Sequence, residues 1–140
     1  MQGSSSRLVI AAGWLGWFSV FFVRFAPSPV LILIERDFSA SHSDASLVFT
    51  GHLMAYAIMQ IPAGIMSDLI GPTRVMVLGL IAMSLSSIAI GLSPGLMPMI
   101  ALAFIAGLGA GTFYTTSTSL VSVSFPPRER GRVLGIIYSG

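Results

Sequence analysis

The chain has 140 residues, of which 54% are hydrophobic and only 9% are charged. Soluble globular domains carry about 25% charged residues, so a water-soluble fold of this size could not cover its surface with so few. The net charge of +2 is too small to indicate a nucleic-acid partner, and the absence of cysteine excludes disulfides and thiolate metal sites. The composition therefore predicts an integral membrane protein whose main solvent is lipid.

Four apolar segments are long enough to cross the bilayer as α-helices, which takes about 20 residues for about 30 Å of hydrocarbon. These segments are residues 8–34, 45–66, 75–92 and 96–125. A secretory signal peptide is disfavoured for the first of them, because three more spans follow it. The short connections predict antiparallel neighbours, so we expect an all-α membrane fold that forms one block over residues 1–140.

A fifth apolar stretch begins near Val133, after a basic loop, and the sequence stops before it is long enough to span. We therefore expect a fifth helix to begin there and the chain to be a piece of a longer protein. The alternative is a self-contained four-helix membrane scaffold or assembly subunit without transport activity. A reading frame that continues beyond Gly140 into further spans would favour the longer protein.

Basic residues predict the orientation, because Lys and Arg favour the cytoplasmic side of a membrane. With the N-terminus inside the cell, the cytoplasmic side receives five Arg residues and the outer side receives one. The five are Arg7, Arg74, Arg128, Arg130 and Arg132, and the outer one is Arg36. We therefore expect a protein of the plasma membrane, the inner membrane of a cell that has two, with its N-terminus in the cytoplasm.

The turn between the second and third segments carries the densest chemical signal, in Gly64, Asp68, Gly71 and Arg74. Gly64 allows a neighbouring helix to approach closely, and Gly71 permits the backbone conformation of a tight reversal. Asp68 can accept backbone N–H groups at a helix start, where the helix dipole favours negative charge. The same residues also suit a generic turn with a capped helix and a basic residue on the cytoplasmic side.

The spacing of these four residues resembles the signature loop of major facilitator superfamily transporters, which lies between their second and third helices. Leu69 and Thr73 stand where that family usually has basic residues. The resemblance implies that the loop is part of a cytoplasmic gate, in which the acid and its basic partners hold two halves of a transporter together. Such contacts can bias a two-state equilibrium by a few kcal/mol.

Two later stretches carry the same resemblance. Glycines recur in the fourth segment at Gly107, Gly109 and Gly111, as in the family's fourth helix, and residues 126–135 resemble its loop into the fifth helix. The chain would then form most of the N-terminal six-helix half of a twelve-helix fold. From spacing alone, Gly107 and Gly111 predict close helix packing rather than a ligand site.

Arg24 is the formal charge placed deepest within a predicted span. Translocon scales assign about 2.5–3.5 kcal/mol to an Arg at a helix centre, so such a residue usually faces a cavity or a partner. Two interpretations stay open. Arg24 binds an anionic group of the substrate or a membrane-buried acid, or it snorkels to the headgroups because the residues before it already span. Pro27 and Pro29 predict a kink or an end of the helix directly afterwards.

Two polar residues are further candidates for contacts with a substrate. Tyr114 lies in a run of hydroxyl side chains that can also bond to the carbonyls of their own helix. Gln60, in the second segment, either lines a cavity or bonds to a neighbouring helix.

The leading hypothesis is a secondary transporter, a symporter or antiporter, that moves a small solute across the lipid bilayer by alternating access. Arg24 favours an organic anion as the solute. A coupling ion such as H⁺ would be expected to use a buried Asp or Glu, and none lies in these segments. We find no catalytic set, phosphate loop, cofactor site or metal site, so an enzyme is disfavoured. The isolated chain is expected to be inactive in transport, because four helices cannot enclose a path that needs two halves.

Overall fold

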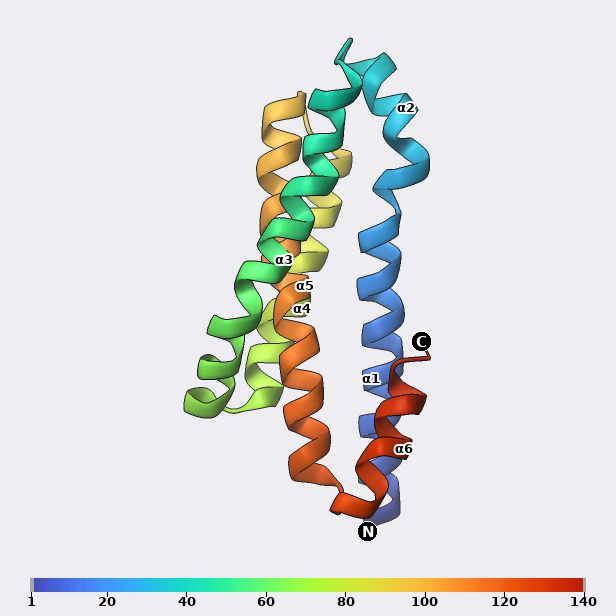
Figure 1. The fold of residues 1–140 in the computed structure, drawn as a ribbon, viewed down its shortest axis with the longest axis vertical. Coiled ribbons are helices and arrows are strands. Elements are labelled where there is room, and N and C mark those ends of the chain that lie inside the picture. The colour runs from blue at the N-terminus through green and yellow to red at the C-terminus, as the bar shows by residue number, and fades with distance from the viewer. Residues whose placement is uncertain (1, 140) are drawn as a thin grey trace.

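The computed structural model describes residues 2–139, with side chains described for residues 8–26 and 29–139. Figure 1 shows a bundle of helices, and no strand is present among the described residues. The helices are α1 (Gln2–Phe25), α2 (Pro27–Asp37), α3 (His42–Ile70), α4 (Pro72–Gly91), α5 (Leu96–Ser124) and α6 (Pro127–Ile137). Four of them, α1, α3, α4 and α5, are long and apolar enough to cross a membrane, which confirms the predicted all-α membrane fold.

The first predicted span is two helices that follow one another in nearly the same direction (Figure 1). The break falls at Ala26, whose backbone N–H still donates to the Phe22 carbonyl at 2.9 Å and whose dihedral angles are helical. Pro27 cannot donate a backbone hydrogen bond, so the ladder is interrupted there and α2 starts with proline in its first turn. The result is a joint rather than a sharp kink.

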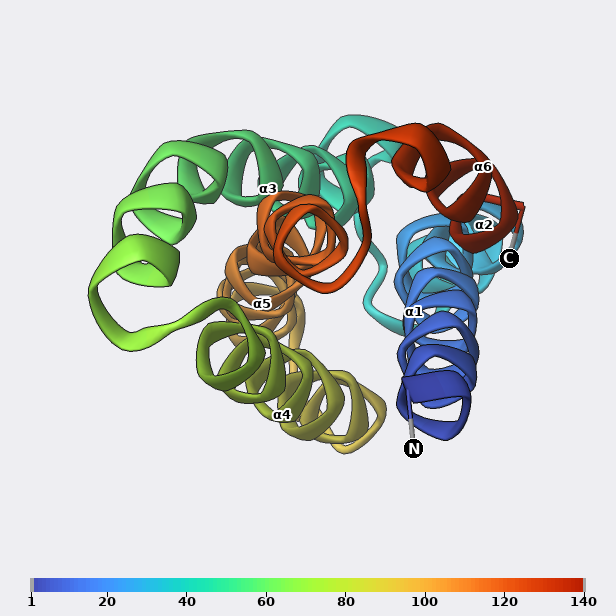
Figure 2. The same cartoon turned by 90° about the horizontal axis from the view of Figure 1, so that it is seen from below.

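Helix α5 is the centre of the packing. It packs most extensively against α3 and α4, and the view along the bundle in Figure 2 shows α5 lying between them. Helices α1 and α6 lie beside each other on the other side of α5 and pack against it less extensively. The fold is therefore a tight block of α3, α4 and α5, to which α1, α2 and α6 are attached by smaller contacts.

The glycines of α5 allow two different neighbouring helices to approach closely. A Cβ atom built on Gly111 would lie 2.5 Å from the Tyr56 carbonyl oxygen of α3, and one on Gly107 would overlap the carbonyl of His52 in the same helix. A Cβ atom on Gly109 would instead lie 2.5 Å from the carbonyl oxygen of Gly79 in α4. Residues four apart on a helix share a face, so α3 and α4 each approach the α5 backbone on its own side.

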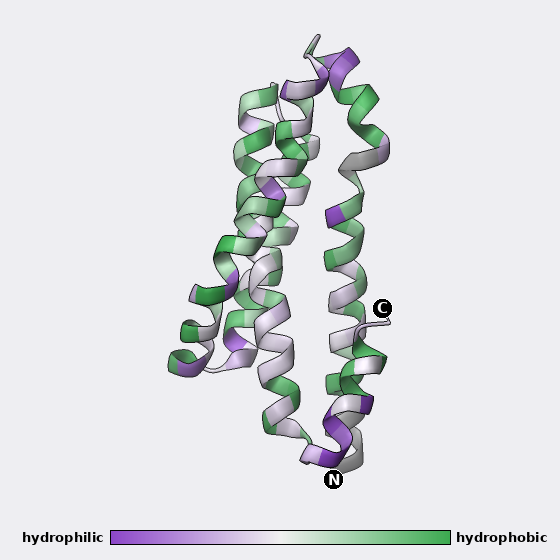
Figure 3. Cartoon of the chain, in the orientation of Figure 1, coloured by the Kyte–Doolittle hydropathy of each residue, from purple (hydrophilic) through white to green (hydrophobic). Residues whose placement is uncertain are grey.

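The outer surface of the bundle is apolar. Large aliphatic and aromatic side chains are more than half exposed on each of the four spanning helices, and examples are Phe22, Ile61, Leu85 and Met97. Figure 3 shows hydrophobic residues along all the long helices, whereas hydrophilic residues gather mostly at the two ends of the bundle. Such a surface suits a lipid environment, where a contiguous apolar exterior carries no penalty.

The structure corrects the predicted role of Asp68. This residue lies in the last turn of α3 and not at a helix start, because α3 continues through Leu69 and Ile70. The N-cap of α4 is Gly71, which offers no side chain to cap the helix. Asp68 therefore lies at the negative end of a helix dipole, and its predicted capping role is wrong.

The loop before the fifth apolar stretch is also different from the prediction. Helix α6 begins at Pro127, so the basic residues are already helical, and proline suits the first position of a helix. Arg130 reaches back to the end of α5, where its Nε donates to the Phe125 carbonyl at 3.0 Å and its Nη2 to the Ser122 carbonyl at 2.6 Å. The side chain of Arg7, which the predicted orientation counts, lies outside the described residues.

Candidate functional site

The charged residues of the predicted gating loop lie exposed at one end of the bundle. Asp68 and Arg74 flank Gly71, and no ion pair joins them within the part of the chain whose side chains are described. Gly71 has φ +92° and ψ 144°, a conformation that favours glycine, and it turns the chain from α3 into α4. Gly64 lies further back in α3, where a Cβ atom would make an ordinary contact, 3.5 Å from the Thr115 Cγ2.

Tyr114 belongs to an aromatic cluster between α1, α5 and α6. Its ring stacks on Tyr138 with centroids 6.2 Å apart and lies edge-on to Trp17 at 5.8 Å. The side chain is 42% exposed, and its neighbour Thr118 hydrogen bonds to the Tyr138 hydroxyl at 2.8 Å. The structure thus places Tyr114 on a face shared with the start of α6.

Gln60 connects two helices through its backbone. Its carbonyl accepts a hydrogen bond from the Thr115 Oγ1 of α5 at 3.2 Å, while its side chain is half-buried. Most other hydroxyls of α5 bond to their own helix: Thr112 to the Gly109 carbonyl and Thr116 to the Thr112 carbonyl, both at 2.7 Å. These hydroxyl groups are satisfied without a ligand, as expected for Ser and Thr in apolar helices.

Arg24, in the last turn of α1, is directed toward α3. Its guanidinium carbon lies 5.4 Å from the ring centroid of Tyr56 and 5.7 Å from that of Phe25, which are cation–π contacts. The Arg24 Nε is enclosed by protein atoms and has no hydrogen-bond partner among the described residues. A buried donor is costly to leave unpaired, so the Arg24 Nε carries an unsatisfied hydrogen-bonding requirement.

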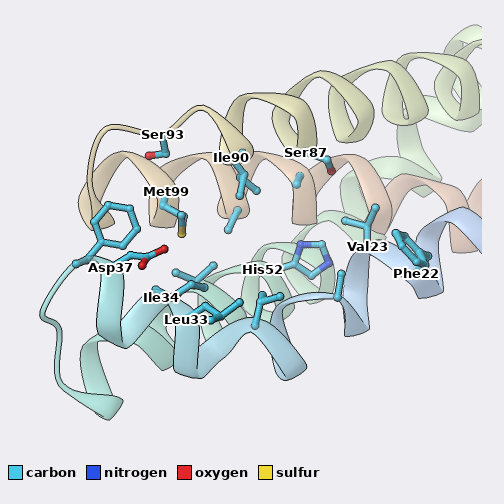
Figure 4. A pocket seen from close by; sticks show the side chains of 17 residues that line it. Phe22, Val23, Leu33, Ile34, Asp37, His52, Ser87, Ile90, Ser93 and Met99 are labelled. Carbon is cyan, nitrogen blue, oxygen red and sulfur yellow. The ribbon is translucent and has the colours of Figure 1, made fainter.

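A pocket of about 550 Å³ opens between the α1–α2 joint and the α3–α5 block. Figure 4 shows its wall, which is mostly apolar and includes Val23 of α1 and Met99 of α5. The polar groups in the lining are the Asp37 carboxylate, the His52 imidazole and the hydroxyls of Ser87 and Ser93. Small-molecule sites typically combine an apolar wall with a few polar groups in this way.

His52 is the most enclosed polar group of this pocket. Only 3% of the residue is exposed, and its Nε2 has no hydrogen-bond partner among the described residues. Sequence reasoning missed His52 because it considered formal charges, and a neutral imidazole has none. The signal that could have found it is its position as a lone ionisable residue in the middle of an apolar segment.

Arg24 of α1 is directed toward α3, and His52 of α3 is directed toward α1, at the same level of the bundle. Tyr56, on which Arg24 stacks, lies four residues after His52, so both belong to one face of α3. Val23, directly before Arg24, and Ala26, two residues after it, line the pocket that holds His52. The structure therefore brings together one predicted site residue, Arg24, and two that sequence reasoning missed, whereas Tyr114 packs with the rings of Trp17 and Tyr138.

The amino-acid sequence is similar to those of known proteins. The family model of the Major Facilitator Superfamily matches residues 13–140. The chain is 27% identical to the "Probable sulfoacetate transporter" of Cupriavidus necator over 95% of this chain and 31% of the relative. It is 31% identical to a multidrug resistance protein of Mycobacterium tuberculosis over 92% of this chain and 24% of the relative. It is 29% identical to a hexuronate transporter of Bacillus subtilis over 84% of this chain and 28% of the relative.

The chain spans less than a third of the length of these curated relatives. The match to the family model nevertheless covers all four spanning helices apart from the first residues of α1, and it continues through α6. The fold class that the signature loop and the glycine-rich segment predicted is thereby confirmed. The chain belongs to the Major Facilitator Superfamily.

Proposed function

We propose that this chain contributes to the secondary transport of a small organic anion by alternating access, with Arg24 as the residue that binds the anionic group. The observation that carries the proposal is the Arg24 Nε, which is buried without a partner inside a membrane helix. An arginine in that position is costly unless it has a counter-charge, and an anionic solute would supply one.

The direction of the side chain supports binding rather than snorkelling. Helix α2 continues for 11 residues beyond the joint, which is about 16 Å at 1.5 Å per residue. Arg24 is thus some distance from the end of the helical rod, and its guanidinium lies over the ring of Tyr56 in the neighbouring helix. A snorkelling side chain would extend along its own helix toward the headgroups.

The names of two relatives support the class of solute. Sulfoacetate and hexuronates are small organic anions, and the proteins named for their transport match 95% and 84% of this chain. The multidrug resistance relative shows that a comparable likeness also extends to proteins named for other solutes. The buried Arg24 of this chain is therefore the reason for preferring an anion.

The gating loop has a proposed role in the same cycle. Asp68 and Arg74 are exposed and are not paired with each other within the described residues, so both are available to groups on the other half of a transporter. Charge-assisted hydrogen bonds to such groups would favour one of the two states of an alternating-access cycle. Leu69, which is exposed beside Asp68, contributes no charge to this contact.

Direct binding tests the proposal. The 140-residue chain in lipid nanodiscs is expected to bind radiolabelled sulfoacetate or galacturonate in equilibrium dialysis, and not the neutral sugar galactose. Arg24→Gln should weaken anion binding by at least about tenfold, because a charged hydrogen bond is worth about 1.5–3 kcal/mol. Arg36→Gln is the matched control, since it removes an exposed Arg from the end of the same helical rod. Equal anion binding by the wild type and Arg24→Gln would overturn the proposal.

A further inference from the structure

The His52 imidazole is a buried titratable group that the proposed role of Arg24 does not use. Its Nε2 is buried and has no partner among the described residues, and the residue lines a pocket large enough for a small molecule. Figure 4 shows the ring projecting from α3 into the space between α1–α2 and α5. An unpartnered nitrogen in such a place carries a free energy penalty that a ligand would remove.

The backbone that carries this ring is held firmly. Helix α5 packs directly on the His52 carbonyl through Gly107, which has no side chain to keep the helices apart. The imidazole therefore enters the pocket from a fixed point. Arg24 reaches the same face of α3 from α1, where it stacks on Tyr56, about one helical turn from His52.

We infer that Arg24 and a protonated His52 form a two-cation site for a small dianion, and that His52 takes up a proton from the solvent when the dianion binds. This inference rests on the proposed function. The proton comes from a hydronium ion of the solvent: an O–H bond of that ion breaks, an N–H bond forms at the free lone pair of the imidazole, and a water molecule is released.

Charge balance in an apolar pocket is the reason for this coupling. In the empty pocket the Arg24 guanidinium repels a second positive charge on His52, and the low dielectric strengthens that repulsion. A dianion between the two groups offsets both charges, so proton and dianion stabilise each other. A monoanion is already balanced by Arg24 alone and gives His52 no reason to become charged.

Other titratable groups near His52 are few in the described part of the chain. Asp37 of α2 lines the same pocket, Tyr56 lies one turn away on α3, and Arg24 faces α3 from α1. Helices α4 and α5 contribute hydroxyl and apolar groups to the lining but no titratable ones. Asp37 is thus the one carboxylate in the lining whose effect on binding has to be separated from that of His52.

The pH dependence of binding tests the inference, with sulfoacetate as the dianion and ethanesulfonate as the monoanion. Both probes stay fully ionised between pH 6 and pH 8, so a change in affinity reports on the protein. For wild-type chain in nanodiscs, sulfoacetate affinity should rise as pH falls, by up to about tenfold per pH unit for one proton taken up. Ethanesulfonate affinity should change little over the same range.

Two variants separate the contributions. His52→Gln should bind sulfoacetate with an affinity that no longer depends on pH. Asp37→Asn should keep the pH dependence of the wild type. A sulfoacetate affinity that is the same at pH 6 and pH 8, or pH dependence that survives in His52→Gln, would overturn the two-cation site.

The outcomes distinguish this inference from the function on which it rests. If both anions bind, and their binding requires Arg24 but does not depend on pH, the proposed role of His52 is wrong and the proposed anion binding by Arg24 still holds. Binding of neither anion would remove both proposals.

A spectroscopic measurement does not depend on the folding of a His52 variant. In His42→Gln chain the remaining imidazole is His52, so ¹⁵N-histidine NMR reports on it alone. Saturating sulfoacetate at pH 7 should convert its signal from the neutral to the protonated form. An unchanged neutral signal with sulfoacetate bound would contradict the inference.

Discussion

Gly107 of α5 lies against the backbone carbonyl of His52 in α3, so closely that a methyl group on the glycine would overlap it. This contact joins the packing of the bundle to its candidate site, because it fixes the backbone from which the imidazole projects. Since lipid provides no hydrophobic driving force between helices, close backbone approach of this kind is a main source of association in a membrane.

Gly107→Ala is expected to destabilise the chain, by about 1–3 kcal/mol, because the added methyl group has no space and the helices must move apart. Gly135→Ala is the matched control, since Gly135 is also helical and has no atom within 4 Å of a built Cβ. Thermal unfolding in detergent, followed by circular dichroism, should show a lower midpoint only for Gly107→Ala. Equal midpoints for the two variants would mean that α3 and α5 are not in backbone contact.

Gly71→Ala should weaken the turn between α3 and α4 by about 1–3 kcal/mol, which is the cost of a conformation at positive φ that side chains rarely adopt. Space is not the cause, because nothing lies within 4 Å of a built Cβ at this position. Gly95→Ala isolates the effect, since Gly95 is likewise the N-cap of a helix but has an extended φ of −175°. The free energy of unfolding, measured by titration with a denaturing detergent, should fall much further for Gly71→Ala.

Arg130→Gln should destabilise the junction of α5 and α6 by about 1–2 kcal/mol. This free energy is at the low end of the range for hydrogen bonds to a charged group, because the Arg130 side chain is only half-buried. The carbonyls of Ser122 and Phe125, at the end of α5, would lose the donors that satisfy them. Arg132→Gln removes the same charge from an exposed neighbour and should have little effect. Amide hydrogen exchange at the end of α5 would distinguish a local loss of protection from global unfolding.

The predicted orientation can be tested directly, because the chain has no cysteine. A membrane-impermeant maleimide added to intact cells should label the Ser43→Cys variant, whose position lies at the predicted outer end of the bundle. The Thr73→Cys variant should react only after the membrane is permeabilised, since this exposed position lies at the predicted cytoplasmic end. The reverse pattern of labelling would mean that the N-terminus faces outward.

The spanning helices were predictable because an apolar run of about 20 residues is a strong signal, whereas their ends were not. Helix α4 begins at Pro72 and not at the first apolar residue, Val75, because proline is favoured at the start of a helix. Asp68 was misplaced for a related reason: hydropathy located the polar turn, but the positive φ of Gly71 decides where α3 ends.

Only part of the candidate site could be predicted from sequence. Arg24 was found because a formal charge in an apolar segment is conspicuous. His52 carries no formal charge at neutral pH, and Tyr56 acquires its importance only when α1 and α3 lie side by side. The reach of Arg130 across a turn to the end of α5 likewise depends on the position of α6, which composition does not reveal.

The interruption between α1 and α2 has a mechanical consequence. Pro27 and Pro29 have no N–H, so the carbonyls of Val23 and Phe25 lack the donors that a continuous helix would give them. Two hydrogen bonds lost within three residues make this point easier to bend than the rest of the two helices. Tilting α2 about this point would widen or narrow the space beside His52 without unwinding any other turn. The first transmembrane segment can therefore move as two helices joined by a hinge.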